Sequence, residues 1–246
     1  MDKLLYIAMS GASQTLRAQA ATSHNLANAN TTGFKADLSE FQSRAVTGPG
    51  FASRVYATDA SVGWDSSVGS QITTGNPFDV AVQGQGFIAV QDSQGNEAYT
   101  RNGDLHVDPN GQLMTAAGLQ VLGDNGPVSV PPFASASVAP DGTISIVPMG
   151  QTPQTISNVG RIKLVNPPSD TVSRSADGLF RTNSGQPADA DASTTVASGV
   201  LEGSNVDLAG SMVNMIELSR NFDLQIKAMH AAEDDGNASA KLLQSS

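Results

Sequence analysis

Both ends of the chain carry apolar residues spaced alternately three and four positions apart, and the segment between them does not. Near the C-terminus these are Leu208, Met212, Met215, Phe222, Ile226 and Met229, with Ser219 as a polar interruption. Near the N-terminus they are Leu5, Met9, Ala12, Leu16 and Leu26, interrupted by Gln19 and Ser23. Seven residues make nearly two helical turns, so this spacing keeps one side of a helix facing a partner helix. The pattern predicts that the chain begins and ends with coiled-coil helices.

The limits of the two helices follow from the residues that flank the periodic segments. The first is predicted from Leu4 to about Asn28, where a stretch of Asn, Thr and Gly favours a turn. The second is predicted from Val206 to about Ala232, and beyond Asp234–Asn237 it either breaks or continues to the end. Residues 1 to 35 are net positive and residues 203 to 246 net negative, which favours pairing of the two ends.

The middle of the chain is typical of antiparallel β structure. Short runs of β-branched and aromatic residues from 79 to 165 alternate with tight-turn dipeptides such as Asn110-Gly111 and Asp141-Gly142. The expected fold class is α+β, with terminal coiled-coil helices packed together and flanking a mainly antiparallel β domain. The expected segments are a helix at 1–33, an extended connector with a few short strands at 34–75, a β domain at 76–202 and a helix at 203–246.

Composition excludes several function classes. A formal charge of −10 with no Lys/Arg cluster disfavours binding to nucleic acid or to anionic lipid. There is no cysteine, which excludes disulfides and thiolate chemistry. The apolar run Leu4–Met9 is too short for a secretory signal or a membrane span, so we expect neither membrane insertion nor a cleaved signal peptide.

Two motifs resemble chemical sites, and an ordinary structural explanation is favoured for each. Gly84-Gln85-Gly86 begins a G-x-G-x-x-A pattern, but the residues after it continue as a strand, whereas a dinucleotide site needs a helix there. Asp104, His106 and Asp108 share a strand face, but no further metal ligands lie nearby in the sequence. We therefore predict no catalytic residues, no cofactor and no metal.

The apolar rows themselves allow two interpretations. Both helices could cover the β domain as ordinary amphipathic helices, or they could take part in assembly. Ala209, Val213 and Ile216 form a second apolar stripe beside the first, and the N-terminal helix is rich in Ala, which permits close approach of several helices. This surplus of apolar surface favours assembly over simple packing.

Several segments, in order along nearly the whole chain, resemble the bacterial flagellar rod and hook proteins. They are Ser10-Gly11-Ala12, Asn25-Leu26-Ala27-Asn28, Thr32-Gly33-Phe34-Lys35, Gly84-Gln85-Gly86-Phe87, Tyr99-Thr100-Arg101-Asn102-Gly103, Ser204-Asn205-Val206 and Met212-Val213-Asn214-Met215-Ile216. The opening residues and the modest length are more similar to the proximal rod members of the family. The alternatives are a distal rod or hook-type subunit or, with less support, an extracellular fibre protein.

The resemblance implies a structural subunit of the flagellar basal-body rod that is not an enzyme. Family members are exported unprocessed by the flagellar type III apparatus and assemble with copies of themselves and with other rod proteins. The rod crosses the periplasm and transmits motor torque, so the implied role is in motility. Carried over to this sequence, the assembly positions are Asn25, Leu26, Asn28, Gly33, Phe34, Asn205, Val206, Met212, Val213, Met215 and Ile216.

Overall fold

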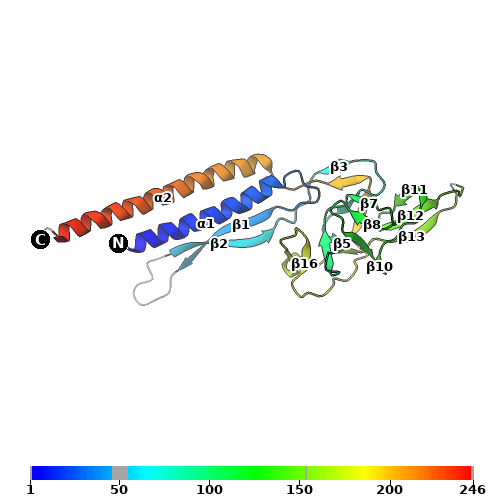
Figure 1. The fold of residues 1–246 in the computed structure, drawn as a ribbon, viewed down its shortest axis with the longest axis horizontal. Coiled ribbons are helices and arrows are strands. Elements are labelled where there is room, and N and C mark those ends of the chain that lie inside the picture. Colours follow the sequence, from blue (N-terminus) through cyan, green and yellow to red (C-terminus); the bar gives the residue numbers. More distant parts are fainter. Residues whose placement is uncertain (1, 46–54, 153, 245–246) are drawn as a thin grey trace. The chain divides into compact units, whose positions relative to one another are not determined.

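The computed structural model describes residues 2–45, 55–152 and 154–244. Contacts divide the chain into two compact units, which are drawn in Figure 1. Unit 1 comprises Met1–Ala29, Ala36–Trp64 and Val206–Ser246, and unit 2 comprises Asn30–Lys35 and Asp65–Asn205. As expected, an N-terminal and a C-terminal helix flank a mainly antiparallel β middle segment in the sequence.

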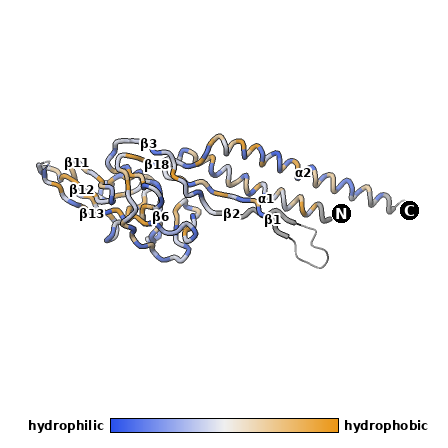
Figure 2. The backbone as a smooth tube through the Cα atoms, turned by 180° about the vertical axis from the view of Figure 1, so that it is seen from behind, coloured by the Kyte–Doolittle hydropathy of each residue, from blue (hydrophilic) through white to orange (hydrophobic). Residues whose placement is uncertain are grey.

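Unit 1 contains two long helices that run antiparallel and contact each other. Helix α1 spans Asp2–Ala27 and helix α2 spans Leu208–Gln244. Asn214 of α2 donates a hydrogen bond to Thr22 of α1, while Gly11, nearer the start of α1, faces Gln225, farther along α2. Hydrophobic positions recur along the length of both helices in Figure 2, as the sequence periodicity predicts.

The helix ends follow the local sequence closely. Asn28 follows the last residue of α1, and both its backbone amide and its side-chain amide donate to the carbonyl of His24. Asp207 caps α2, because its carboxylate accepts the amide of Ala209 two residues ahead. The second helix then continues through Asp234–Asn237, so it does not break there.

Residues 37–45 and 55–64 form two paired strands, here called the hairpin, where the sequence indicated an extended connector with a few short strands. Strand β1 (Asp37–Ala45) pairs antiparallel with strand β2 (Val55–Trp64), and both strands contact α1. Asn25 fastens the start of β1, because its side chain donates to the carbonyl of Asp37 and accepts from the Asp37 amide. A two-stranded hairpin is marginal in water by itself, so packing on α1 is what makes this one stable.

Unit 2 is built from short antiparallel strands. A nine-stranded sheet has the order β15-β16-β6-β5-β9-β8-β7, with β10 paired to β9 and β14 to β5; β11-β12-β13 form a second sheet, and β17-β4 and β18-β3 form two pairs. The bounds are β3 Gln71–Thr73, β4 Val80–Gln83, β5 Phe87–Gln91, β6 Glu97–Thr100, β7 Leu105–Val107, β8 Leu113–Thr115, β9 Gln120–Gly123, β10 Gly126–Pro127, β11 Phe133–Val138, β12 Thr143–Pro148, β13 Ser157–Arg161, β14 Leu164–Val165, β15 Val172–Arg174, β16 Phe180–Thr182, β17 Thr195–Ser198 and β18 Val200–Glu202, with a 3₁₀ turn at Ser169–Thr171.

The core of unit 2 lies where the faces of these sheets meet. It is aliphatic and centres on Val80, Val82, Ile88, Leu105, Leu113, Ile144, Ile146, Ile162 and Leu164, all of them buried. The expected turn glycines Gly111 and Gly142 take positive φ values. Gly103 does not; an added Cβ there would overlap the Val80 carbonyl, so glycine is needed for a close approach rather than for a turn.

Candidate assembly interface

Small side chains, not the large apolar ones, fill the buried face of α1. That face consists of Ala8, Ala12, Thr15, Ala18 and Thr22, which recur at helical spacing. The two threonine hydroxyls donate to the carbonyls four residues back, so burying them leaves no unpaired donor. Because the side chains are small, α1 can approach both α2 and the hairpin closely. Of the N-terminal row predicted from the sequence, Ala12 is buried, whereas Leu5, Met9 and Leu16 are exposed.

The buried face of α2 lies in a slightly different register from the predicted one. Met215, Phe222, Ile226 and Met229 are half-buried as expected. Further buried or half-buried positions are Ser211, Leu218, Gln225 and Ala232, so Ser211 and Leu218 take the places expected for Met212 and Ser219. Leu218 is only 4% exposed, while Leu208 and Met212 are nearly half exposed. Ser219, which the sequence pattern placed inside the apolar row, is exposed and lies outside the buried face of α2.

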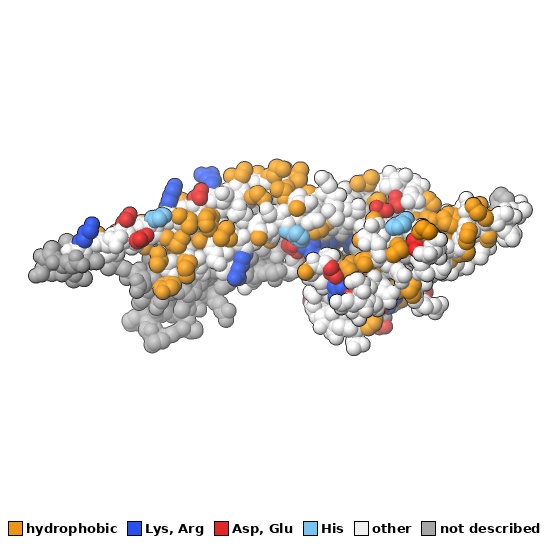
Figure 3. Space-filling model, in the orientation of Figure 1, with side chains coloured by type: hydrophobic (Ala, Val, Ile, Leu, Met, Phe, Trp, Pro, Cys, Tyr) orange, Lys and Arg blue, Asp and Glu red, His pale blue; other side chains and the backbone are white. Residues whose placement is uncertain are grey.

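Large apolar side chains remain uncovered on unit 1. Their exposure runs from 39% at Leu5 to 61% at Ile216, and they form what we call the apolar stripe: Leu5, Met9 and Leu16 on α1, and Leu208, Met212, Val213 and Ile216 on α2. Figure 3 shows hydrophobic atoms gathered over both helices of this unit. Leu38 and Phe41 of β1 are exposed as well. Exposed apolar side chains in this number are typical of surfaces that bind other proteins.

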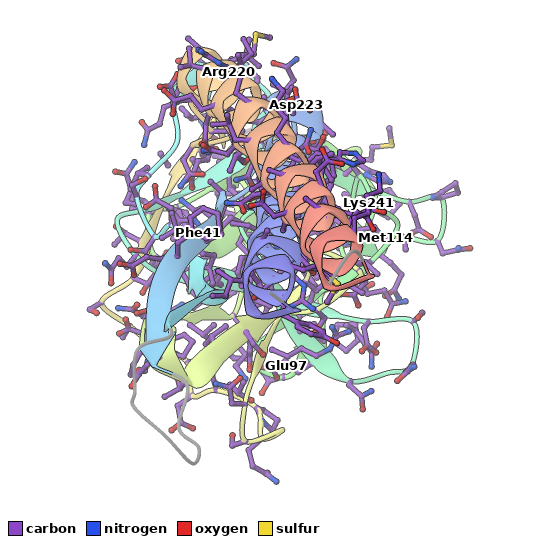
Figure 4. All side chains as sticks on the ribbon, turned by 90° about the vertical axis from the view of Figure 1, so that its left-hand side faces the viewer. Phe41, Glu97, Met114, Arg220, Asp223 and Lys241 are labelled. Atoms are coloured by element: carbon purple, nitrogen blue, oxygen red, sulfur yellow. The ribbon has the colours of Figure 1, made fainter. Side chains whose placement is uncertain are left out.

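The apolar stripe is bounded by charge on α2. Arg220 and Asp223 project from the side of α2 turned away from α1, as Figure 4 shows, and both are exposed. Arg220 and Asp223 follow Ile216 at helical spacing, four and seven residues later, so they lie on the same side of α2 as Ile216, farther along the helix. An ordinary covering helix would carry polar residues all along that side.

The predicted positions at the end of α1 make contacts within unit 1. Asn25 bridges to β1, Asn28 caps the helix, and Leu26 is half-buried. His24 adds a hydrogen bond, with its Nδ1 2.8 Å from Oδ2 of Asp37. These residues hold the helix end to the hairpin, so they position the apolar stripe rather than extend it. Val206 is half-buried just before α2.

Gly33, Phe34 and Asn205 belong to unit 2, where they are brought together. The Gly33 amide donates to the carbonyl of Glu202 at 2.7 Å, and the Asn205 amide donates to the carbonyl of Phe34 at 3.3 Å. Gly33 has φ +69°, and an added Cβ would overlap the backbone at Arg101, so both its angle and its space require glycine. Gly33 is buried, and its contacts are intramolecular.

Beside these residues lies a buried ionic cluster of Lys35, Arg101 and Glu202. Nζ of Lys35 is 2.7 Å from Oε1 of Glu202, and Nη2 of Arg101 is 2.7 Å from Oε2; the three side chains are 1% to 2% exposed. Arg101 also donates to the carbonyls of Gly84 and Gly86, which explains the two glycines that formally resembled a dinucleotide motif. Burial lowers the pKa of Lys35, and the Arg101 charge acts in the same direction, while Glu202 opposes it.

Sequence reasoning missed Glu202. It lies 167 residues from its partner Lys35, and a single carboxylate before Gly203 carries no local signal. Only the resemblance motifs pointed to its surroundings, because they contain Lys35, Gly84, Gly86 and Arg101.

Two ion pairs lie in an open cleft of unit 2. This cleft, of about 1380 Å³, is lined by Lys163, Glu97, Arg181, Asp92 and further residues. Lys163 lies 2.8 Å from Glu97, and Arg181 lies 2.9 Å from Asp92, so these charges neutralise each other. Across the described residues there is no group of three His, Cys, Asp or Glu arranged to hold a metal, and no helix is long and apolar enough to cross a membrane.

Three family models match separate parts of the chain. They are described as "Flagella basal body rod protein" over residues 5–35, "Flagellar hook protein FlgE/F/G D1 domain" over 81–146, and "Flagellar basal body rod FlgEFG protein C-terminal" over 197–242. The first and third cover α1 and most of α2, including the apolar stripe. The second covers a large part of the β core of unit 2.

Curated relatives match over the full length. The "Flagellar basal-body rod protein FlgF" of Escherichia coli (strain K12) and that of Salmonella typhimurium (strain LT2) are each 42% identical, covering 100% of this chain and 100% of the relative. The "Flagellar basal-body rod protein FlgG" of Bacillus subtilis (strain 168) is 31% identical over 95% of this chain and 96% of the relative. The chain therefore belongs to the flagellar basal-body rod protein family.

Proposed function

We propose that this protein is a structural subunit of the bacterial flagellar basal-body rod and that it assembles through the apolar stripe of unit 1. The observation that carries the proposal is the uncovered apolar surface on two helices that family models assign to the rod proteins. The relatives named FlgF are more similar to the chain than the FlgG relative described above, which supports a place in the proximal rod.

Assembly would complete the packing that the single subunit leaves unfinished. The two helices pair within the subunit as a short antiparallel coiled coil, and the apolar stripe docks on helices of neighbouring subunits. Its seven residues are each about half exposed, so burying the rest yields roughly 1 kcal/mol per residue, or about 7 kcal/mol per subunit before ordering costs. Copies of this chain and other rod proteins are the partners.

The work of such a subunit is mechanical rather than catalytic. In the rod, close helix packing carries motor torque across the periplasm, and the small side chains of α1 permit that packing. We propose that the chain needs no cofactor, binds no nucleic acid, does not insert into a membrane, and reaches the rod through the flagellar type III export apparatus without a cleaved signal. Marginal helices in the free subunit suit passage through a narrow export channel.

Gene deletion in the source bacterium tests the proposal. The deletion strain should be non-motile, its basal bodies should lack the rod beyond the proximal end, and the wild-type gene should restore both. Mass spectrometry should find the chain in purified wild-type basal bodies. A deletion strain that swims normally, or basal bodies that lack the chain, would exclude the rod function.

A further inference from the structure

The chain passes between unit 1 and unit 2 four times. The crossings fall after Ala29, Lys35, Trp64 and Asn205, so the unit 2 segments beside them are 30–35, the residues from Asp65 onward, and those that end at Asn205. These segments are far apart in sequence. Within unit 2, however, they lie against one another.

Hydrogen bonds from each segment converge on Glu202 and Asn205. Oε1 of Glu202 accepts from Nζ of Lys35 at 2.7 Å and from the amide of Gly69 at 3.0 Å. Nζ of Lys35 also donates to the Ser67 carbonyl at 2.6 Å. The side chain of Asn205 donates to the carbonyls of Asp65 and Ser67 at 3.0 and 3.1 Å. One carboxylate and one amide therefore join three segments of the chain.

The short segment 30–35 depends on these contacts. Besides the Lys35 ammonium, it is held by Arg174, which donates to the Lys35 carbonyl at 2.6 Å and lies over the Phe34 ring at 4.7 Å. The segment has no strand pairing of its own. Six residues without a strand or helix would follow the movements of α1 and β1 unless their side chains were anchored in unit 2.

We propose that the Lys35–Glu202–Arg101 cluster is a clasp that keeps these segments joined in unit 2 whether or not the helices of unit 1 are folded. The geometry gives the clasp its strength, because Glu202 is the carboxylate shared by both buried cations, and without it neither Lys35 nor Arg101 would keep this counter-charge. Arg101 is fixed in turn by the Gly84 and Gly86 carbonyls. The clasp thus holds the unit 2 ends of these segments together independently of unit 1. This inference does not depend on the rod function.

Hydrogen exchange on the purified full-length protein tests the clasp. The reporters are the backbone amides of Gly33, Gly69 and Asn205. The first two donate to Glu202, and the third donates to the carbonyl of Phe34, next to Lys35. Leu218→Asp places a charge in the buried contact of the helix pair and should abolish protection of the unit 1 helices while the three reporters stay protected. Lys35→Met should lower reporter protection by about 100-fold or more, since it removes the two charge-assisted hydrogen bonds that Nζ donates to Glu202 and to the Ser67 carbonyl.

Lys163→Met is the matched control, because Lys163 also pairs with a glutamate in unit 2, at a site outside the clasp. It should leave the three reporters unchanged. Glu202→Gln should expose them at least as much as Lys35→Met; the Lys35 variant retains the Arg101–Glu202 pair, so unit 2 should remain folded in it. Loss of reporter protection together with the helices in Leu218→Asp, or full protection in Lys35→Met, would overturn the proposal.

Discussion

Ile216→Asp separates assembly from folding more cleanly than any other change on the apolar stripe. Ile216 is 61% exposed in the subunit, so the substitution should change the free energy of unfolding by no more than about 0.5 kcal/mol. On docking, the isoleucine would bury that remaining surface, which is worth roughly 1 to 2 kcal/mol. An unpaired carboxylate in the same contact costs about 2 kcal/mol or more in addition. The affinity of the docking contact that contains residue 216 should therefore fall by at least about 100-fold.

The assay is complementation of a deletion strain, read by swimming in soft agar and by the amount of the chain in purified basal bodies. Ile216→Asp should be expressed at the wild-type level, yet be nearly absent from basal bodies and fail to restore swimming. Asn221→Asp adds the same charge at an exposed position of α2 outside the apolar stripe and should behave as wild type. Normal swimming with Ile216→Asp, or an equal defect with Asn221→Asp, would refute the reasoning.

The other predictions concern the helix ends, the turn before the clasp and the core of unit 2. Leu26→Asp and Met215→Asp should abolish rod incorporation and motility, because both side chains are half-buried; wild-type swimming speed in either would contradict this. Gly33→Ala should lower the melting temperature of the protein much more than Gly84→Ala. Both glycines have φ near +70°, but only Gly33 lacks space for a Cβ. An equal fall in melting temperature would show that the backbone angle alone matters. Burial raises the pKa of Tyr99 to about 12 from 10, so the unfolded chain loses this proton first. Urea unfolding should therefore show a contribution of about 3 kcal/mol that is present below pH 10 and lost as the pH rises from 10 through 12, and Tyr99→Phe should remove that pH dependence.

The helices and most of the strands could be predicted because their signals are local. Each signal, such as the apolar period or the Asn-rich end of α1, can be recognised from a few neighbouring residues. The observed ends of α1 and the observed start of α2 lie within about two residues of the prediction. The run at 161–165, one of the short runs that favoured β structure, does not form a single strand: β13 ends at Arg161 and β14 begins at Leu164, with Ile162 making a separate bridge to Gly123.

The register of the helix pair could not be predicted, because periodicity assigns the largest side chains to the interior. Here the hairpin and α2 both crowd α1, and only Ala and Thr fit between them. Large residues such as Met9 and Leu16 are therefore displaced to the surface, where we propose they serve assembly. On α2, Leu218 is buried and Met212 is exposed.

The hairpin and the ionic cluster were missed for a different reason. Strand β1 exposes Leu38 and Phe41, so it lacks the alternation of a half-buried strand, and its pairing with β2 is completed by contacts with α1. Lys35 and Glu202 attract each other only once the whole of unit 2 has folded. Neither interaction has a signature in any short window of sequence.

A cryo-electron microscopy map of purified basal bodies tests the central claim most directly, because it shows what covers the apolar stripe. If the account is right, Leu5, Met9, Leu16, Met212 and Ile216 lose most of their accessible surface to helices of neighbouring subunits, while Arg220 and Asp223 remain in polar surroundings. A rod in which this subunit is present but those apolar side chains still face solvent would contradict it.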